Sequence, residues 1–355
     1  MKIFMKVIFY AAAFLNIFAL SGCSNTKNKY KSENIKMPNY SDVTVIESRE
    51  NGGDIFNINN NQLFKEGTID HISEMKYNAQ KSVYVYLVGM DKAEQRNNKI
   101  VILYENTKSE IKDFFTALDI KMDPSGDKIA YRTFKSSAAD SAQGMKVYDI
   151  KNKKYIELKS KVLVSGNLYE WLDDHRIIYY GDIEGQKNSD KIYLYDFNRD
   201  KEQVYLDNTR GYCMYFTSIG SNLLFLSRDQ DELNLYYYNH KSEQFQLLSD
   251  KFQQIYNSEV NKKSGDVFFI GKNDENIDSL YKFTQNNGKL SRITYDFPGE
   301  IAVLNGMTQD KSGNVYFIGI GDRENNEDIF MYSSNKKSID IISDHEGKYD
   351  IYGEN

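Results

Sequence analysis

Acidic side chains gather in four polar loops, and they are the residues best suited to bind a ligand. The loops are residues 181–190, 227–233, 272–278 and 321–328, and each has a formal charge of −2 or −3. Their candidate ligand-facing residues are Asp182, Glu184, Asp229, Asp231, Glu232, Asp274, Glu275, Asp278, Asp322 and Glu324. Such carboxylates could bind Ca²⁺ or attract a basic partner. None follows the spacing of a calcium loop, so we expect no metal or other cofactor, with Ca²⁺ as the minor alternative.

No catalytic motif accompanies these acids. The four histidines, His71, His175, His240 and His345, are far apart in the sequence, and none belongs to an H-E-x-x-H or H-x-H pattern. A G-x-S-x-G elbow, a Walker loop and a dinucleotide-binding glycine pattern are missing as well. The sequence therefore assigns no catalytic residue.

The first 22 residues have the three parts of a secretory signal: a basic start, an apolar stretch and a small-residue end. Leu20, Ser21, Gly22 and Cys23 then resemble the bacterial lipobox, in which the cysteine receives a lipid before cleavage. This resemblance implies a palmitate-bearing lipoprotein anchored through Cys23 to the outer face of a bacterial cell membrane. Two or three acyl chains hold a protein stably, whereas one does not.

Residues 23–41 follow as the lipidated cysteine and a polar, lysine-rich tether. With Cys23 lipidated, Cys213 has no disulfide partner, and its apolar neighbours predict a buried thiol. Removing residues 1–22 would change the formal net charge from −6 to −8. Nucleic acid is disfavoured as a partner by this charge and by the expected location.

From residue 42 onward the sequence repeats. Strands rich in aromatic and β-branched residues begin at positions 82, 128, 176, 223, 267 and 315, which are 44 to 48 residues apart. Each is followed by a polar loop, a third strand, a short turn and a fourth strand. No stretch has the apolar spacing of a helix. The period predicts an all-β fold, a β-propeller of four-stranded blades over residues 42–355.

Three short turns support this fold: residues 123–130, 263–267 and 310–315 each place an Asp or Lys and a Gly before the second strand. They resemble the turns of TolB-type propeller repeats, and the Tyr-rich segments 178–182 and 192–196 are closer to the YWTD type. The resemblance implies a fold and no activity.

Six complete units span about residues 71–344. Residues 42–66 contain three further strands without an inner one, and residues 348–352 form a lone strand at the other end. We predict that these two segments pair to close a seventh blade, with six blades as the alternative.

The acidic loops join second to third strands and so share one face of the propeller. The turns on the opposite face, such as residues 151–154 and 335–337, are neutral or basic. We expect the tether to leave from this less acidic face, so that the acidic face points away from the membrane. The predicted function is a binding or scaffold module for an envelope protein, peptide or glycan. The alternative is an extracytoplasmic lyase or glycosidase with its site in the axial channel, where carboxylates could converge.

Overall fold

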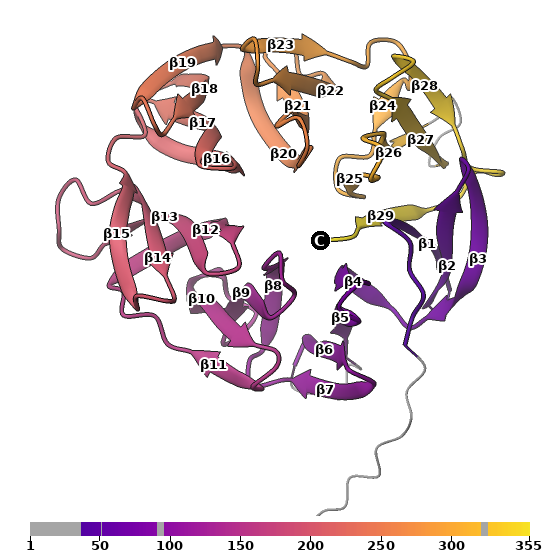
Figure 1. Cartoon of the computed structure of the whole chain (residues 1–355), viewed down its shortest axis with the longest axis horizontal. Coiled ribbons are helices and arrows are strands. Elements are labelled where there is room, and N and C mark those ends of the chain that lie inside the picture. The colour runs from indigo at the N-terminus through magenta and orange to yellow at the C-terminus, as the bar shows by residue number, and fades with distance from the viewer. Residues whose placement is uncertain (1–36, 51, 91–95, 321–325) are drawn as a thin grey trace, which may run out of the picture. The chain divides into compact units, whose positions relative to one another are not determined.

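Seven four-stranded antiparallel sheets surround a common axis in the computed structural model of the chain, which describes residues 37–50, 52–90, 96–320 and 326–355 (Figure 1). The predicted signal, lipobox and lipidated cysteine lie outside these residues. Within the described residues, one short 3₁₀ turn, Ala139–Ser141, is the only helical element. No helix in these ranges is long and apolar enough to cross a membrane.

The blades are numbered in chain order, and each is given from its inner to its outer strand. Blade 1 is β29 (Tyr349–Gly353), β1 (Val43–Arg49), β2 (Gly52–Asn59) and β3 (Gln62–Ile69). Blade 2 is β4 (Ile72–Asn78), β5 (Val83–Gly89), β6 (Asn98–Tyr104) and β7 (Thr107–Ile111). Blade 3 is β8 (Thr116–Met122), β9 (Lys128–Phe134), β10 (Ala142–Asp149) and β11 (Lys154–Ile156). Blade 4 is β12 (Val162–Asp173), β13 (Arg176–Ile183), β14 (Lys191–Asp196) and β15 (Lys201–Leu206).

Blade 5 is β16 (Tyr212–Ile219), β17 (Asn222–Asp229), β18 (Glu232–Asn239) and β19 (Gln244–Ser249). Blade 6 is β20 (Phe252–Val260), β21 (Val267–Asn273), β22 (Asp278–Thr284) and β23 (Lys289–Arg292). Blade 7 has its inner strand in two pieces, β24 (Glu300–Ile301) and β25 (Met307–Gln309), which both pair with β26 (Val315–Ile320); β27 (Glu327–Ser333) and β28 (Ser338–Ile341) follow.

The last strand in the chain closes the ring. β29 pairs antiparallel with β1, with Val43 opposite Gly353 and Glu47 opposite Tyr349. The predicted pairing and the predicted count of seven blades are both confirmed, and the six-blade alternative is wrong. Without β29, the inner edge of β1 would present unpaired backbone groups to the axis.

The turns that open the second strands are held by their leading polar residue. The Asp123 carboxylate accepts the backbone N–H of Lys128 at 3.0 Å, and Asp310 accepts those of Ser312 and Asn314 at 2.9 and 2.8 Å. Gly126 and Gly313 take the positive φ angles, +75° and +85°, that make such tight turns possible.

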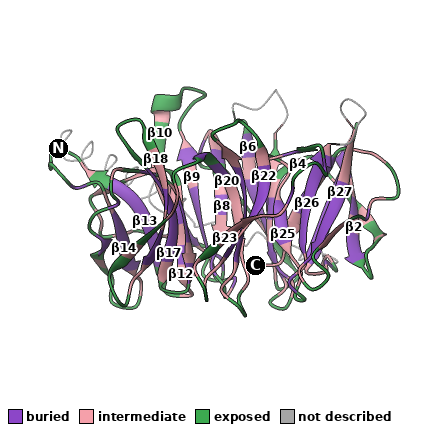
Figure 2. Ribbon diagram, turned by 90° about the horizontal axis from the view of Figure 1, so that it is seen from above, coloured by how far each residue is buried: buried purple, intermediate pink, exposed green. Residues whose placement is uncertain are grey.

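Seven hydrophobic clusters form the core, one between each pair of neighbouring blades. The largest fully buried side chains are all Tyr or Phe, so aromatic packing of blade on blade is the main use of these residues. Cys213 is fully buried in the cluster between blades 4 and 5, and burial raises the pKa of its thiol to about 12. The predicted buried thiol is confirmed. Figure 2 shows buried residues along the strands and exposed residues mainly at the two ends.

Residues 37–41, part of the predicted tether, pack against blades 1 and 2. Tyr40 is buried, and its hydroxyl lies 3.1 Å from that of Tyr86. The Tyr84 hydroxyl donates to the carbonyl of Pro38 at 2.7 Å. This short segment therefore belongs to the core between the first two blades.

If β29 closes the ring, its buried side chains should contribute far more to stability than exposed ones of the same type. Ile351→Ala should lower the free energy of unfolding by about 2–5 kcal/mol because it leaves a cavity beside β1. The matched control is Ile341→Ala on the outer strand β28, where Ile341 is 49% exposed; it should cost less than about 1 kcal/mol. Denaturant unfolding measures both values. Equal losses, or undiminished thermal stability after truncation at Asp344, would contradict closure by β29.

Candidate functional site

The propeller has two distinct faces. We call one the loop face: it carries the loops between second and third strands and the connections between blades. The turn face carries the turns between first and second and between third and fourth strands. The eight described acidic candidates all lie on the loop face or at the strand ends that adjoin it: Asp182, Glu184, Asp229, Asp231, Glu232, Asp274, Glu275 and Asp278. Asp322 and Glu324 lie outside the described residues.

Seven of these eight candidates are exposed, and Asp278 is the exception. One Asp278 oxygen lies 3.7 Å from the Lys272 ammonium, and the other is buried without a hydrogen-bond partner among the described residues. In those same residues, no three His, Cys, Asp or Glu side chains are placed to hold a metal ion. The structure thus groups the acidic residues by face and does not join them into one coordination site.

Exposed apolar side chains share the loop face with the acids. Of the twelve large apolar residues that are exposed in the described ranges, four lie on outer strands: Phe64, Val204, Leu247 and Ile341. The other eight lie in loop-face connections or in inner strands: Leu118, Leu163, Tyr212, Met214, Ile277, Tyr295, Phe297 and Leu304. No turn-face turn holds any of the twelve. Apolar exposure is therefore concentrated on the face that also carries the acidic loops.

Five of the eight belong to the inner strands or to the break in the inner strand of blade 7. Tyr212 packs edge-on against Tyr180; we call the other four, Leu118, Leu163, Met214 and Leu304, the apolar collar. Leu118 and Met214 lie at β-bulges of β8 and β16. Leu304 is 87% exposed and lies in the segment that separates β24 from β25. That segment contacts the inner strands on both sides, because Val303 accepts a bond from Asn257 of β20 and Asn305 bonds to Tyr349 of β29. Irregularities in the inner strands thus expose apolar side chains that regular pairing would bury.

Five of the charged residues on the inner strands affect one another's pKa, and we call these five the axial cluster. Glu74 and Lys76 lie on β4, Lys121 on β8, Glu170 on β12 and Glu259 on β20. All five are half-buried. Their charges influence one another across the axis, since Lys76 of blade 2 favours the ionised form of Glu259 in blade 6. No pair of them comes within 4 Å to form an ion pair.

Two of the carboxylates bridge neighbouring blades. Glu74 accepts the backbone N–H of Ile120 at 3.1 Å, and Glu170 accepts that of Ser218 at 3.1 Å. Glu170 also accepts from the Thr217 hydroxyl at 3.2 Å. Burial nevertheless raises the pKa of both carboxyls, and Lys76 and Lys121 act against this rise.

Glu259 has no such bond. Burial raises its pKa from 4.5 to about 7, although Lys76 and Lys262 act in the opposite direction. Burial also lowers the pKa of Lys121, which Glu170 partly counteracts. Charged groups held apart and poorly solvated along an axis are typical of ligand sites.

The axis is crossed on the turn face by Glu354 and Asn355, and Figure 1 shows this end of the chain at the centre of the ring. The Glu354 carboxylate accepts the backbone N–H of Ala79 in blade 2 and pairs with Lys311 in blade 7 at 2.7 Å. The Asn355 side chain donates to the carbonyl of Asp123 in blade 3 at 2.7 Å. These contacts connect the C-terminal residues to blades 2, 3 and 7 across the turn-face end of the axis.

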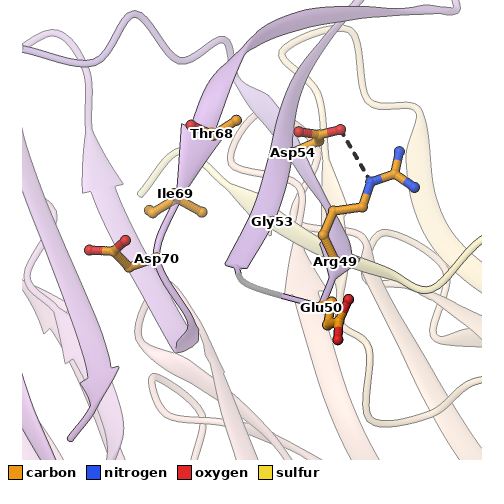
Figure 3. Close-up of a pocket in the computed structure, with 7 residues that line it drawn as sticks. All are labelled: Arg49, Glu50, Gly53, Asp54, Thr68, Ile69 and Asp70. Atoms are coloured by element: carbon orange, nitrogen blue, oxygen red, sulfur yellow. Dashed lines mark hydrogen bonds and ion pairs between the residues drawn. The ribbon is translucent and has the colours of Figure 1, made fainter. Parts of the chain in front are cut away.

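A hollow of about 660 Å³ opens on blade 1, lined by Arg49, Glu50, Gly53, Asp54, Thr68, Ile69 and Asp70 (Figure 3). Its Asp54 carboxylate is already paired with Arg49 at 3.2 Å and with Lys65 at 2.8 Å. The Glu50 and Asp70 carboxylates point away from each other in Figure 3. The hollow therefore lacks converging groups, and the axis is the better candidate site.

A model of the family "prolyl oligopeptidase, N-terminal beta-propeller domain" matches residues 18–289. The chain belongs to this family. The match covers most of the chain and agrees with the sheet topology. A search of the curated proteins found no match.

Solved structures show the same fold for this family member at low sequence identity. The β-propeller domain of the trilobed protease from Pyrococcus furiosus is 14% identical, with 78% of this chain and 85% of that one covered and a TM-score of 0.53. That domain is described as having an open velcro topology, whereas β29 closes the ring here. Dipeptidyl peptidase 4 from Porphyromonas gingivalis is 12% identical, with a TM-score of 0.53; 88% of this chain matches, but only 53% of that one. The chain thus spans about half the length of that peptidase.

TolB from Acinetobacter baumannii is also similar, at 12% identity, with 87% of this chain and 82% of that one covered and a TM-score of 0.46. At such low identity, the trilobed protease domain and the dipeptidyl peptidase show the propeller fold alone.

Glu259 should make stability depend on pH. The folded chain keeps this proton up to about pH 7, whereas the unfolded chain releases it near pH 4.5, so stability should fall as pH rises through that window. Glu259→Gln removes this contribution. At pH 8 the variant should be more stable than the unsubstituted chain by about 2–3 kcal/mol, and near pH 4.5 the two should be equal. Denaturant unfolding at the two pH values measures the difference.

The control is Glu275→Gln on an exposed loop, which should change stability little at either pH. A Glu259→Gln variant that is no more stable than the unsubstituted chain at pH 8 would contradict a poorly solvated carboxyl on the axis.

Proposed function

We propose that this propeller is a lipid-anchored binding module that holds a basic segment of a partner protein on its loop face, outside the cell membrane. The observation that carries the proposal is the shared location of the exposed apolar residues and the acidic loops. A monomeric surface seldom exposes a large apolar patch unless something binds there.

The two kinds of residue have complementary tasks. The apolar collar and the neighbouring Tyr295 and Phe297, 63% and 48% exposed, can form the water-excluding centre of an interface. The acidic loops surround this centre and attract a basic partner over a longer range. Aliphatic side chains dominate the collar, which favours a protein or peptide segment over a glycan.

The contacts of residues 40–42 support the expected orientation. Asp42 accepts the backbone N–H of Lys311, a turn-face residue, at 2.9 Å. A lipid at Cys23 would therefore tether the propeller from the side of its turn face. The loop face would then be free to meet a partner.

The enzymatic alternative, a lyase or glycosidase at the axis, is favoured by one observation. A carboxyl with a pKa of about 7, such as that of Glu259, suits a general acid or base. A glycosidase needs a pair of carboxylates on either side of the scissile bond. Here the carboxylates alternate with Lys76 and Lys121, which suits the binding of charged groups better.

Selection from a library of random linear peptides tests the binding function. The selected peptides should combine basic with apolar residues, and raising the salt concentration should weaken their binding. Leu304→Ser should weaken binding of a selected peptide about tenfold or more, because it removes an anchor of the collar. The matched control, Leu247→Ser, changes a leucine that is 54% exposed on the outer strand β19 and should leave binding unchanged. Acidic peptides, or equal effects of the two variants, would contradict the proposal.

The anchor has its own test. Replacing Cys23 by Ser should move the chain from the membrane fraction to the extracellular or periplasmic fluid, because no thiol remains to accept the lipid. Immunoblots of the fractions and metabolic labelling with palmitate measure the change. The control is Cys213→Ser, which should keep both the label and the membrane location. Membrane retention of the Cys23→Ser chain would contradict lipid anchoring.

A further inference from the structure

Inner strand β20 carries two side-chain hydrogen-bond acceptors that have no donor among the described residues. The Glu259 carboxylate has no hydrogen bond and no ion pair within the described part of the chain, and the buried Oδ1 atom of Asn257 has no partner there either. The two residues are two positions apart, so their side chains leave the strand on the same side. The intervening Ser258 points the other way and bonds to Tyr215 of blade 5 at 2.5 Å.

Asn257 is held in place by its amide nitrogen, which donates to the carbonyl of Val303 in blade 7 at 3.4 Å. Its oxygen therefore remains an acceptor on the same side of β20 as Glu259. A buried acceptor without a donor is costly, so this arrangement favours a ligand that supplies N–H groups. This observation is independent of the charges in the cluster.

The charges of the axial cluster favour a cation in particular. Three carboxylates, those of Glu74, Glu170 and Glu259, face two lysines, Lys76 and Lys121. Lys76 affects the ionisation of Glu259 but lies beyond ion-pair distance from it. Lys121 lies 5.5 Å from the centre of the Tyr169 ring, which already interacts favourably with its charge. Neither lysine therefore neutralises Glu259 directly.

We infer that the axis holds a site for an organic cation, an alkyl guanidinium or ammonium group, whose N–H donors bind the Glu259 carboxylate and the Asn257 amide oxygen. The inference rests on the proposed function and specifies it: the basic side chain of the partner enters the axis while its apolar neighbours contact the collar. Glu170 adds attraction from across the axis. A guanidinium fits best, because its planar fork can reach a carboxylate and a neighbouring acceptor together.

The entrance to this site is the loop face. Glu354 and Asn355 bind residues of blades 2, 3 and 7 across the turn-face end of the axis. A cation arriving from the loop face passes the acidic loops, then the collar, and then meets the cluster. The alkyl part of a long basic side chain suits the apolar collar, and its charged end suits the cluster.

A small probe separates this site from the collar. Butylguanidinium should bind the full chain saturably in an NMR or calorimetric titration, about tenfold more tightly than butylurea, its neutral analogue. Glu259→Gln should reduce the affinity for butylguanidinium roughly tenfold and leave the weak binding of butylurea unchanged. Butylammonium tests whether the fork geometry matters, and it should bind more weakly than butylguanidinium.

Two controls complete the experiment. Glu243→Gln removes an exposed carboxylate from the turn between β18 and β19 on the turn face and should leave the titration unchanged. Unfolding curves should show that the Glu259→Gln variant is folded. Equal affinity for butylguanidinium and butylurea, or no effect of Glu259→Gln, would overturn the inference. If selected peptides bind the collar but butylguanidinium does not bind the chain, only the cation site is refuted. A chain that binds butylguanidinium but selects no peptide would refute the proposed function alone.

Discussion

The pairing of β29 with β1 is the interaction on which the rest of the propeller depends. It supplies the inner strand of blade 1 from residues some 300 positions further along the chain. It also buries Tyr349 and Ile351 in the cluster between blades 1 and 7, which completes the ring of hydrophobic clusters. Closure removes the exposed edge that an open blade would present to the axis. It also places Glu354 and Asn355 where they contact the turns of three other blades.

A closed ring brings the first strands of seven blades around one axis. Residues that are far apart in the sequence then act together: Lys76 and Glu259 come from blades 2 and 6 and still influence each other. Irregular inner strands add the apolar collar on the open side. The acidic loops follow from the same geometry, because every loop between second and third strands reaches the same face. A ligand that moves from the loop face toward the axis would therefore meet the acidic loops first, then the apolar collar, and then the axial cluster.

The sequence predicts the architecture well because the architecture repeats. A period of 44 to 48 residues, the Asp-to-Gly turns and the unpaired strands at both ends together determine seven blades and their closure. The face of the acidic loops follows from strand order alone. Each of these predictions depends on neighbouring residues or on a simple pairing rule.

The axial site could not be predicted in the same way. Glu74 and Lys76 are two positions apart in β4, which is the ordinary spacing of polar residues on one side of a strand. Only the assembled ring shows that their charges interact with those of other inner strands, such as Glu259. Leu118 precedes Asp119, whose φ of +60° lies in a β-bulge that no sequence motif predicts. The contacts of Tyr40 with blade 2 could not be predicted either, because residues 37–41 lack apolar periodicity. Convergence and local irregularity are properties of the assembled ring.

The central claim is that a partner binds at the loop-face end of the axis. Amide hydrogen exchange of the full chain, with and without a bound partner peptide, tests it most directly. We predict slower exchange at the loop-face ends of β8, β12 and β16 and in residues 302–306, with no change in the turn-face turns 151–154 and 335–337. Protection confined to the turn face or to the outer strands would contradict it.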